Sequence, residues 1–201
     1  ITIVATDEAE GTEDRQDLVI GVDDFVGFLT VVGEMPDAGR DGFVLNTDED
    51  VLVSSLGFVA AEDSSVIGDG TPPETGFLVR PTVEADVTIA GTVWSEGGTG
   101  VVLNGGQSLV VTSTGLVDGG ADGIRINQPE RGDDEPAPTV VVDGTVVADN
   151  RGIVVEEDGT TVTVGGSVRT GGIGIAIDAE DVTVRVTGSF RMNPAISAGT
   201  V

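Results

Sequence analysis

Apolar residues recur along the chain in short alternating runs that are cut by glycines. One set of apolar pairs follows a glycine directly: Phe43/Leu45, Phe77/Val79, Val101/Leu103, Ile124/Ile126, Ile153/Val155 and Ile175/Ile177. A second set precedes these: Val51/Val53, Val87/Ile89, Leu109/Val111, Val140/Val142, Val162/Val164 and Val182/Val184. A period of two with many β-branched residues is typical of strands that bury one face. The pattern therefore predicts an all-β protein in which both sets of pairs point inward.

The glycines give these runs a longer period. Seven of them mark a unit of about 22 residues: Gly33, Gly57, Gly91, Gly115, Gly144, Gly166 and Gly188. The longer gaps locate two loop insertions, near residues 61–75 and 128–138. Because a repeat of this length buries its apolar face only by stacking on its neighbours, the spacing predicts a solenoid. We expect a β-helix of about seven to eight turns over residues 25–201, with residues 1–24 as an N-terminal opening turn or cap.

Two local features follow from stacked turns. The corner glycines are expected either to adopt a positive φ or to allow a close approach of backbone that a Cβ would obstruct. Asn104 and Asn127 follow the same strand in neighbouring turns. Their amides are expected to stack as a short ladder, and two unconnected turn asparagines are the alternative.

The outward middle position of the glycine-led strands is mostly apolar where a solvated face would be polar. It holds Val44, Leu78, Val102, Arg125, Val154 and Ala176. A contiguous exposed apolar stripe usually marks an interface. We therefore expect Val44, Leu78, Val102, Val154 and Ala176 to pack against another chain or against a loop such as residues 61–75. The alternative is that β-propensity alone selects valine at this position.

The charge of the chain excludes several classes of partner. Its 201 residues carry 35 Asp and Glu against nine Arg and no Lys, for a formal net charge of -26. Such a chain cannot replace the counterions of nucleic acid, and it is not attracted to anionic lipid. There is no Cys and no apolar run of 18 residues, so neither disulfides nor direct insertion into a membrane is expected. The first residue is Ile1 rather than Met, which indicates a processed or excised segment.

The repeat also resembles a known type. Gly91-Thr92-Val93, Gly144-Thr145-Val146 and Gly166-Ser167-Val168, alternating with Val-x-Val and Gly-Ile-x-Ile, are similar to the right-handed parallel β-helix repeats of bacterial autotransporter passengers and related secreted adhesins. The resemblance covers about residues 25–201. It implies a right-handed helix and an extracellular or bacterial cell-surface protein that serves as an adhesin or a structural stalk.

Candidate chemistry is sparse. Polysaccharide lyases and glycoside hydrolases also use β-helices, and the acidic clusters would supply the two carboxylates that a glycosidase needs. However, the only Trp is Trp94, and there is no Tyr, His or Lys. We therefore expect no enzyme activity, no catalytic residues and no organic cofactor. Calcium is the one candidate ligand, at isolated carboxylates in the insertions: Asp69, Asp133, Asp134 and Glu135.

These observations together predict a secreted or cell-surface structural or adhesive β-solenoid, with a filament or surface-layer subunit as one form of it. Its expected partners are copies of itself or a neighbouring surface protein, and a glycan or host-surface ligand. The alternative is a polysaccharide-degrading β-helix enzyme.

Overall fold

The structure is a computed structural model, and it describes residues 2–4, 19–20, 29–35, 41–45, 51–61, 75–79, 86–104, 108–127 and 136–192. Every regular element in these ranges is a β-strand. The described part of the chain contains no helix that is long and apolar enough to cross a membrane.

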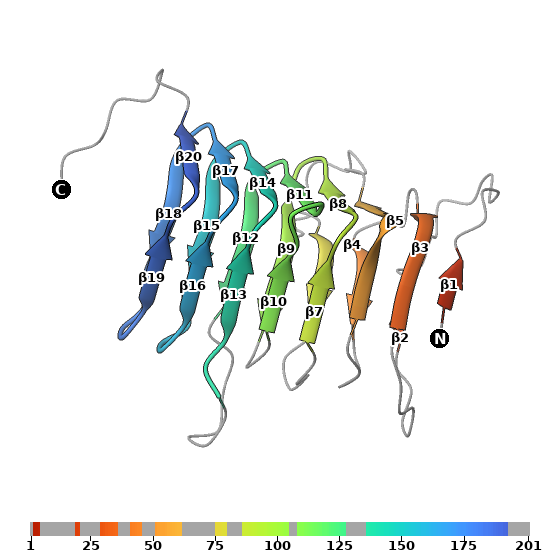
Figure 1. Cartoon of the computed structure of the whole chain (residues 1–201), viewed down its shortest axis with the longest axis horizontal. Coiled ribbons are helices and arrows are strands. Elements are labelled where there is room, and N and C mark those ends of the chain that lie inside the picture. Colours follow the sequence, from red (N-terminus) through yellow and green to blue (C-terminus); the bar gives the residue numbers. More distant parts are fainter. Residues whose placement is uncertain are drawn as a thin grey trace, which may run out of the picture.

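The strands follow one another in coils that stack along a single axis (Figure 1). The first coils comprise β1 (Thr2–Val4) and β2 (Val19–Ile20), β3 (Leu29–Met35) and β4 (Asp41–Leu45), and β5 (Val51–Ala61) and β6 (Thr75–Val79). Four coils of three strands follow: β7 (Asp86–Ile89), β8 (Thr92–Ser95) and β9 (Thr99–Asn104); β10 (Ser108–Val111), β11 (Leu116–Gly119) and β12 (Asp122–Asn127); β13 (Thr139–Val142), β14 (Thr145–Ala148) and β15 (Arg151–Val155); β16 (Thr161–Val164), β17 (Ser167–Thr170) and β18 (Ile173–Ile177). The last described strands are β19 (Thr183–Val186) and β20 (Ser189–Met192).

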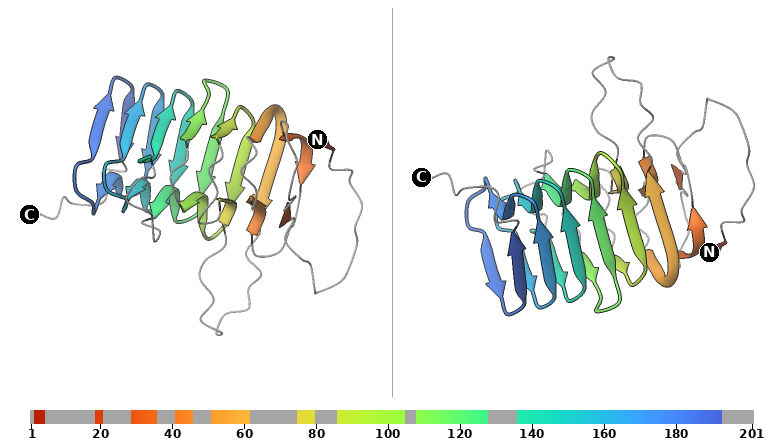
Figure 2. Two further views of the ribbon diagram at one scale, coloured as in Figure 1. Left: turned by 90° about the horizontal axis from the view of Figure 1, so that it is seen from below. Right: turned by 90° about the horizontal axis from the view of Figure 1, so that it is seen from above.

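The coils form three faces, and every strand pair is parallel (Figure 2). The first face holds β1, β7, β10, β13, β16 and β19 together with the first parts of β3 and β5. The second face holds β8, β11, β14, β17 and β20 together with the second parts of β3 and β5. Both β3 and β5 run around the corner from the first face, so that the two faces make a 13-stranded sheet. The third face is a 7-stranded sheet from β2 to β18. The predicted parallel β-helix is confirmed, and its best-described part makes about five turns.

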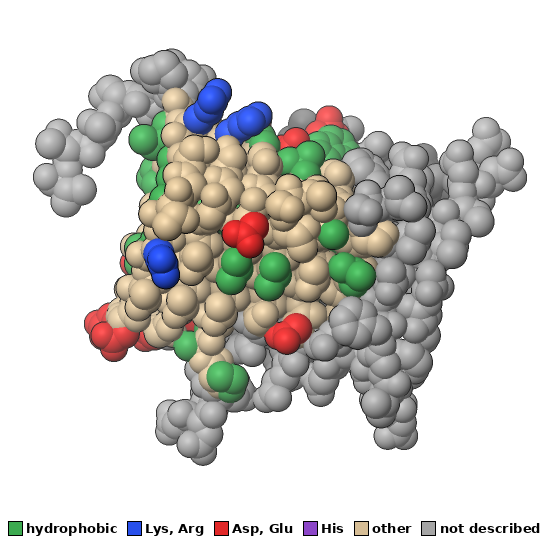
Figure 3. Space-filling model, in the orientation of Figure 1, with side chains coloured by type: hydrophobic (Ala, Val, Ile, Leu, Met, Phe, Trp, Pro, Cys, Tyr) green, Lys and Arg blue, Asp and Glu red, His purple; other side chains and the backbone are tan. Residues whose placement is uncertain are grey.

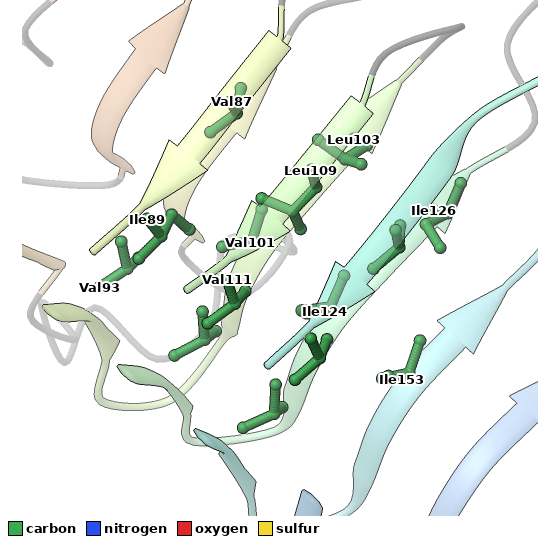
Figure 4. Close-up of a cluster of buried hydrophobic side chains, with 14 of the residues drawn as sticks. Val87, Ile89, Val93, Val101, Leu103, Leu109, Val111, Ile124, Ile126 and Ile153 are labelled. Atoms are coloured by element: carbon green, nitrogen blue, oxygen red, sulfur yellow. The ribbon is translucent and has the colours of Figure 1, made fainter. Parts of the chain in front are cut away.

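The core consists of like side chains stacked on like (Figure 4). The predicted pairs of the middle coils point inward, and each of these side chains is completely buried: Val87/Ile89, Val101/Leu103, Leu109/Val111, Ile124/Ile126, Val140/Val142, Ile153/Val155 and Val162/Val164. A third inward column comes from the second face, with Val93, Val117, Val146 and Val168 also at 0% exposure. Burial of one such side chain contributes about 1.5–3 kcal/mol of transfer free energy. The side chains of Phe43/Leu45 and Phe77/Val79 lie outside the described residues.

The prediction for the last coil is wrong by two residues. Val184 pairs with Val162, and Val186 pairs with Val164, so the inward pair is Val184/Val186 rather than Val182/Val184. Three alternating valines fit either register, and the backbone hydrogen bond from Thr183 N to Thr160 O at 2.9 Å belongs to the observed one. Val182 packs against the core from just before the strand.

The glycines serve close backbone approach rather than unusual dihedral angles. Among the described glycines only Gly159 has a positive φ, of 72°. A Cβ on Gly100 would lie 2.6 Å from Val117 Cγ1 and 2.7 Å from Gly123 O. Gly76, Gly100, Gly123 and Gly152 thus each leave room for the inward valine of the next coil, and Gly174 leaves room for Phe190. Of the two explanations left open by the sequence, close approach is confirmed for these corners.

Both insertions interrupt the coils at corners. β5 ends at Ala61 and β6 begins at Thr75, while β12 ends at Asn127 and β13 begins at Thr139. The strands on either side keep their parallel register with the coils above and below. The inserted residues themselves lie mostly outside the described ranges.

Candidate functional site

The candidate calcium ligands cannot be placed. Asp69, Asp133, Asp134 and Glu135 all lie outside the described residues. Within the described ranges no group of three or more carboxylate, His or Cys side chains is arranged to hold a metal ion. The calcium sites therefore stay a prediction.

The five apolar positions of the predicted stripe and Arg125 form one row across the third face. The pairing register places Val44, Leu78, Val102, Arg125, Val154 and Ala176 side by side in that order. Val102 is 8% exposed and Val154 only 2%, so both are buried within the single chain, and Ala176 is half-buried. The side chains of Val44 and Leu78 lie outside the described residues. The proposed interface along this row thus stays a prediction, and two of its members do not form an open patch.

Arg125 stands in this row between two valines. Its Nη2 donates a hydrogen bond to Glu156 Oε1 at 2.9 Å on the next coil, and its Nε is buried with no hydrogen-bond partner in the described part of the chain. Arg125 is the register partner of Val154, and Glu156 lies two residues beyond Val154 in sequence. The apolar row is therefore interrupted between Val102 and Val154 by Arg125, which forms an ion pair with Glu156.

The asparagine ladder is confirmed. Asn104 and Asn127 are register partners at the ends of β9 and β12, and Asn127 Nδ2 donates to Asn104 Oδ1 at 2.7 Å. The ladder fixes the corner that precedes the second insertion.

A second ion pair lies at the corner between the second and third faces. Asp122 at the start of β12 is 3% exposed, and Arg151 is its register partner on β15. Arg151 Nε donates to Asp122 Oδ1 at 2.9 Å and its Nη2 to Asp122 Oδ2 at 2.6 Å, a bidentate geometry that satisfies both carboxylate oxygens. This hydrogen bonding raises the pKa of Arg151. Arg151 neutralises a buried carboxylate, and we therefore assign the pair a structural role.

The outer row of the second face carries a perturbed carboxyl group. The register places Trp94, Asp118, Val147, Arg169 and Arg191 next to one another in that order. Burial raises the pKa of Asp118 above its ordinary value of 3.8, and the nearby carboxylate of Asp149 raises it further. A carboxyl group with a raised pKa beside the only Trp is the one arrangement in the described residues that resembles part of a sugar-processing site.

Basic side chains gather at one end of the stack. Arg169 and Arg191 are register partners on β17 and β20, and Arg185 lies on β19. All three are exposed, and none forms an ion pair with another described residue. In the view of Figure 3 the basic side chains, in blue, all lie towards the end of the stack that holds β19 and β20. Sequence reasoning missed this group, because its members meet only after the coils are stacked.

The same end exposes apolar side chains. Ile173, Ile177, Val184, Val186 and Met192 are 37–61% exposed. The register partners of the last four in the coil below are buried: Val155, Val162, Val164 and Thr170. Within the described residues β18, β19 and β20 each pair on one side only. In the part of the chain that the structure describes, the end of the stack is therefore apolar and has no strand paired beyond it.

No protein-family model, curated protein or solved structure matches the chain.

Proposed function

We propose that the chain is a structural or adhesive solenoid that is displayed outside the cell or on a bacterial surface. The proposal rests mainly on the unbroken column of inward aliphatic side chains that runs through the stacked coils. Its members Val53, Ile89, Val111, Val142 and Val164 are register partners in succession, and each is completely buried. A solenoid with such a continuous core can serve as a support without any conformational change.

The stack suits a load-bearing role because its interactions repeat between neighbouring coils. Each middle strand is hydrogen-bonded to the coil below and to the coil above, and stability in such a repeat is close to a sum of nearest-neighbour terms. The Asn104–Asn127 ladder and the Arg151–Asp122 pair add side-chain links between coils. Force along the axis is thereby shared among many bonds.

The surface supports an extracellular setting. A net charge of -26 keeps the chain soluble and is screened best in a saline medium. The absence of Cys leaves nothing that oxidation could cross-link during export. The resemblance of the repeats to autotransporter passengers and secreted adhesins agrees with this setting, and the insertions at the corners are where a glycan or a host-surface ligand would be recognised.

Labelling of intact source cells tests the proposal. Antibodies raised against the purified chain should label unpermeabilised cells or detect the protein in the medium, and external protease should remove the signal. Labelling that requires permeabilisation would contradict the surface location. Beads coated with the chain should then adhere to glycan or matrix surfaces if the role is adhesive rather than only structural.

The competing proposal is a polysaccharide-degrading enzyme, and the observation that favours it is Asp118 with its raised pKa beside Trp94. Incubation with neutral and uronate-containing polysaccharides separates the two proposals. The structural account predicts no release of new reducing ends. Release that is lost in Asp118→Asn would support the enzyme instead.

A further inference from the structure

We propose that copies of this chain associate head to tail, with the β18–β19–β20 end of one copy docked on the β1–β2 end of the next. The inference rests on the structural role proposed above and specifies the partner and the direction of assembly. Figure 1 shows that these two ends lie at opposite ends of the stack. Contact between unlike ends does not close on itself and therefore extends into a filament.

The first argument is the continuity of the register. Ile3, Val31, Val53, Ile89, Val111, Val142, Val164 and Val186 form one column of successive register partners along the first face. A second copy stacked in the same direction brings its Ile3 beside Val186. The third face continues in the same way, because β2 of the second copy meets β18. Docking thus repeats a contact that the chain already makes between its own coils.

The second argument is the state of the apolar edge. Val186 is 45% exposed and Ile177 is 50% exposed, although the side chains one coil below, Val164 and Val155, are at 0%. An unpaired parallel edge with exposed aliphatic side chains is a template for another strand. Covering it buries these side chains and pairs the free backbone groups of β18 and β19.

The third argument is the complementarity of charge between the two ends. Residues 161–201 contain three acidic side chains (Asp178, Glu180, Asp181) and three Arg, which balance, whereas residues 1–50 contain fourteen Asp and Glu against two Arg. Arg169, Arg185 and Arg191 are exposed near the docking edge, and Arg169 and Arg191 are adjacent like charges, an arrangement that is unfavourable on its own. An acidic coil docked on this edge relieves that repulsion. Two copies docked tail to tail would instead bring the arginines together.

Sedimentation velocity and negative-stain electron microscopy of the full chain test the association at about 0.15 M salt. We expect linear assemblies that lengthen with protein concentration. Ile177→Ser/Met192→Ser and Arg185→Ser/Arg191→Ser should each reduce the assembled fraction several-fold. The matched controls Val110→Ser/Val141→Ser and Thr88→Glu/Thr145→Glu change apolarity or charge equally at outward positions within the stack, and they should assemble like the parent. A chain that stays monomeric over the whole concentration range, or equal loss in variants and controls, overturns the proposal.

Cross-linking tests the direction. The chain has no Cys, so Val186→Cys and Ile3→Cys can be prepared separately and mixed under mild oxidation. The proposal predicts that the 3–186 heterodimer exceeds both homodimers. A dominant 186–186 dimer indicates tail-to-tail contact, and no cross-link at all indicates that the two ends do not meet; either result overturns the proposal. Circular dichroism verifies that each variant is folded. Cell-surface labelling is an independent measurement, so failure of head-to-tail assembly leaves the proposed surface role standing.

Discussion

Arg151 on β15 holds the buried carboxylate of Asp122 on β12 through two hydrogen bonds, at 2.9 Å from Nε and 2.6 Å from Nη2. Asp122 is 3% exposed, whereas Glu156, the partner of Arg125, has a side chain that is 35% exposed. If the arginine is removed, water can therefore solvate the carboxylate of Glu156 far better than that of Asp122.

Arg151→Met keeps most of the side-chain stem but leaves the Asp122 carboxylate buried without its cation. Because an unsatisfied buried charge loses its solvation as well, we expect the free energy of unfolding to fall by about 1–3 kcal/mol or more. Arg125→Met is the matched control, and its loss should be about 0.2–1 kcal/mol. Urea denaturation measures both variants, and equal losses would contradict the structural role given to Asp122.

Gly165 and Gly166 are adjacent in sequence but differ in what a Cβ would meet. On Gly166 the Cβ would run into the backbone oxygens of Gly144 and Asp143, whereas on Gly165 its nearest contact is the movable carboxylate of Asp143. We therefore expect Gly166→Ala to destabilise the stack by about 1–3 kcal/mol or more. Gly165→Ala should stay within about 1 kcal/mol of the parent. Thermal unfolding of the two variants makes the comparison, and the reverse order of stability would contradict the close backbone contact at Gly166.

Ile126 and Ile177 belong to the same inward column, with Val155 between them. Ile126 is completely buried and Ile177 is 50% exposed. Ile126→Ala should lower the free energy of unfolding by about 2–5 kcal/mol because it opens a cavity. Ile177→Ala should cost less than half as much in the monomer. Denaturant titration at a protein concentration too low for association checks this, and similar losses would mean that the last coil is as well covered as the middle ones.

Asp118 provides a pH-dependent signature. Burial and the Asp149 carboxylate raise its pKa in the folded state, so the folded chain binds this proton more tightly than the unfolded chain does. Stability from this group is therefore present below the ordinary pKa of 3.8 and is lost as the pH rises through the raised value.

Asp118→Asn removes that loss and should increase the melting temperature at about pH 7, with the gain shrinking towards about pH 3. Glu96→Gln removes an exposed carboxylate and serves as the control. Melting curves at several pH values provide the test, and a gain that does not depend on pH would argue against a titration effect.

The fold was predictable because its signal is local and repeated. Alternating pairs such as Ile124/Ile126, the glycine spacing and the positions of the insertions each follow from one stretch of sequence. The Asn104–Asn127 ladder was also predictable, since both residues occupy the same place in neighbouring repeats.

Some features that depend on the register between neighbouring coils were missed. The Val182/Val184 prediction failed because three alternating valines fit two registers. Arg169 and Arg191 occupy the same place in repeats 22 residues apart, so the glycine spacing could have placed them together. The Arg151–Asp122 pair joins residues 29 positions apart across the second insertion, and no local motif marks it. The candidate calcium ligands lie in the insertions, where the repeat offers no register to reason from.

Engineered disulfides test the central claim, the in-register parallel stacking of coils, most directly. Val110 and Val141 are outward register partners on β10 and β13, and a strand spacing of about 4.8 Å lies within the Cα separation that a disulfide tolerates. In Val110→Cys/Val141→Cys, mild oxidation should form an intramolecular disulfide rapidly, detected as the loss of two hydrogens by mass spectrometry. Val110→Cys/Thr163→Cys places the thiols two coils apart and should stay reduced. Ready closure of the second pair, or failure of the first in a folded chain, would contradict the stack.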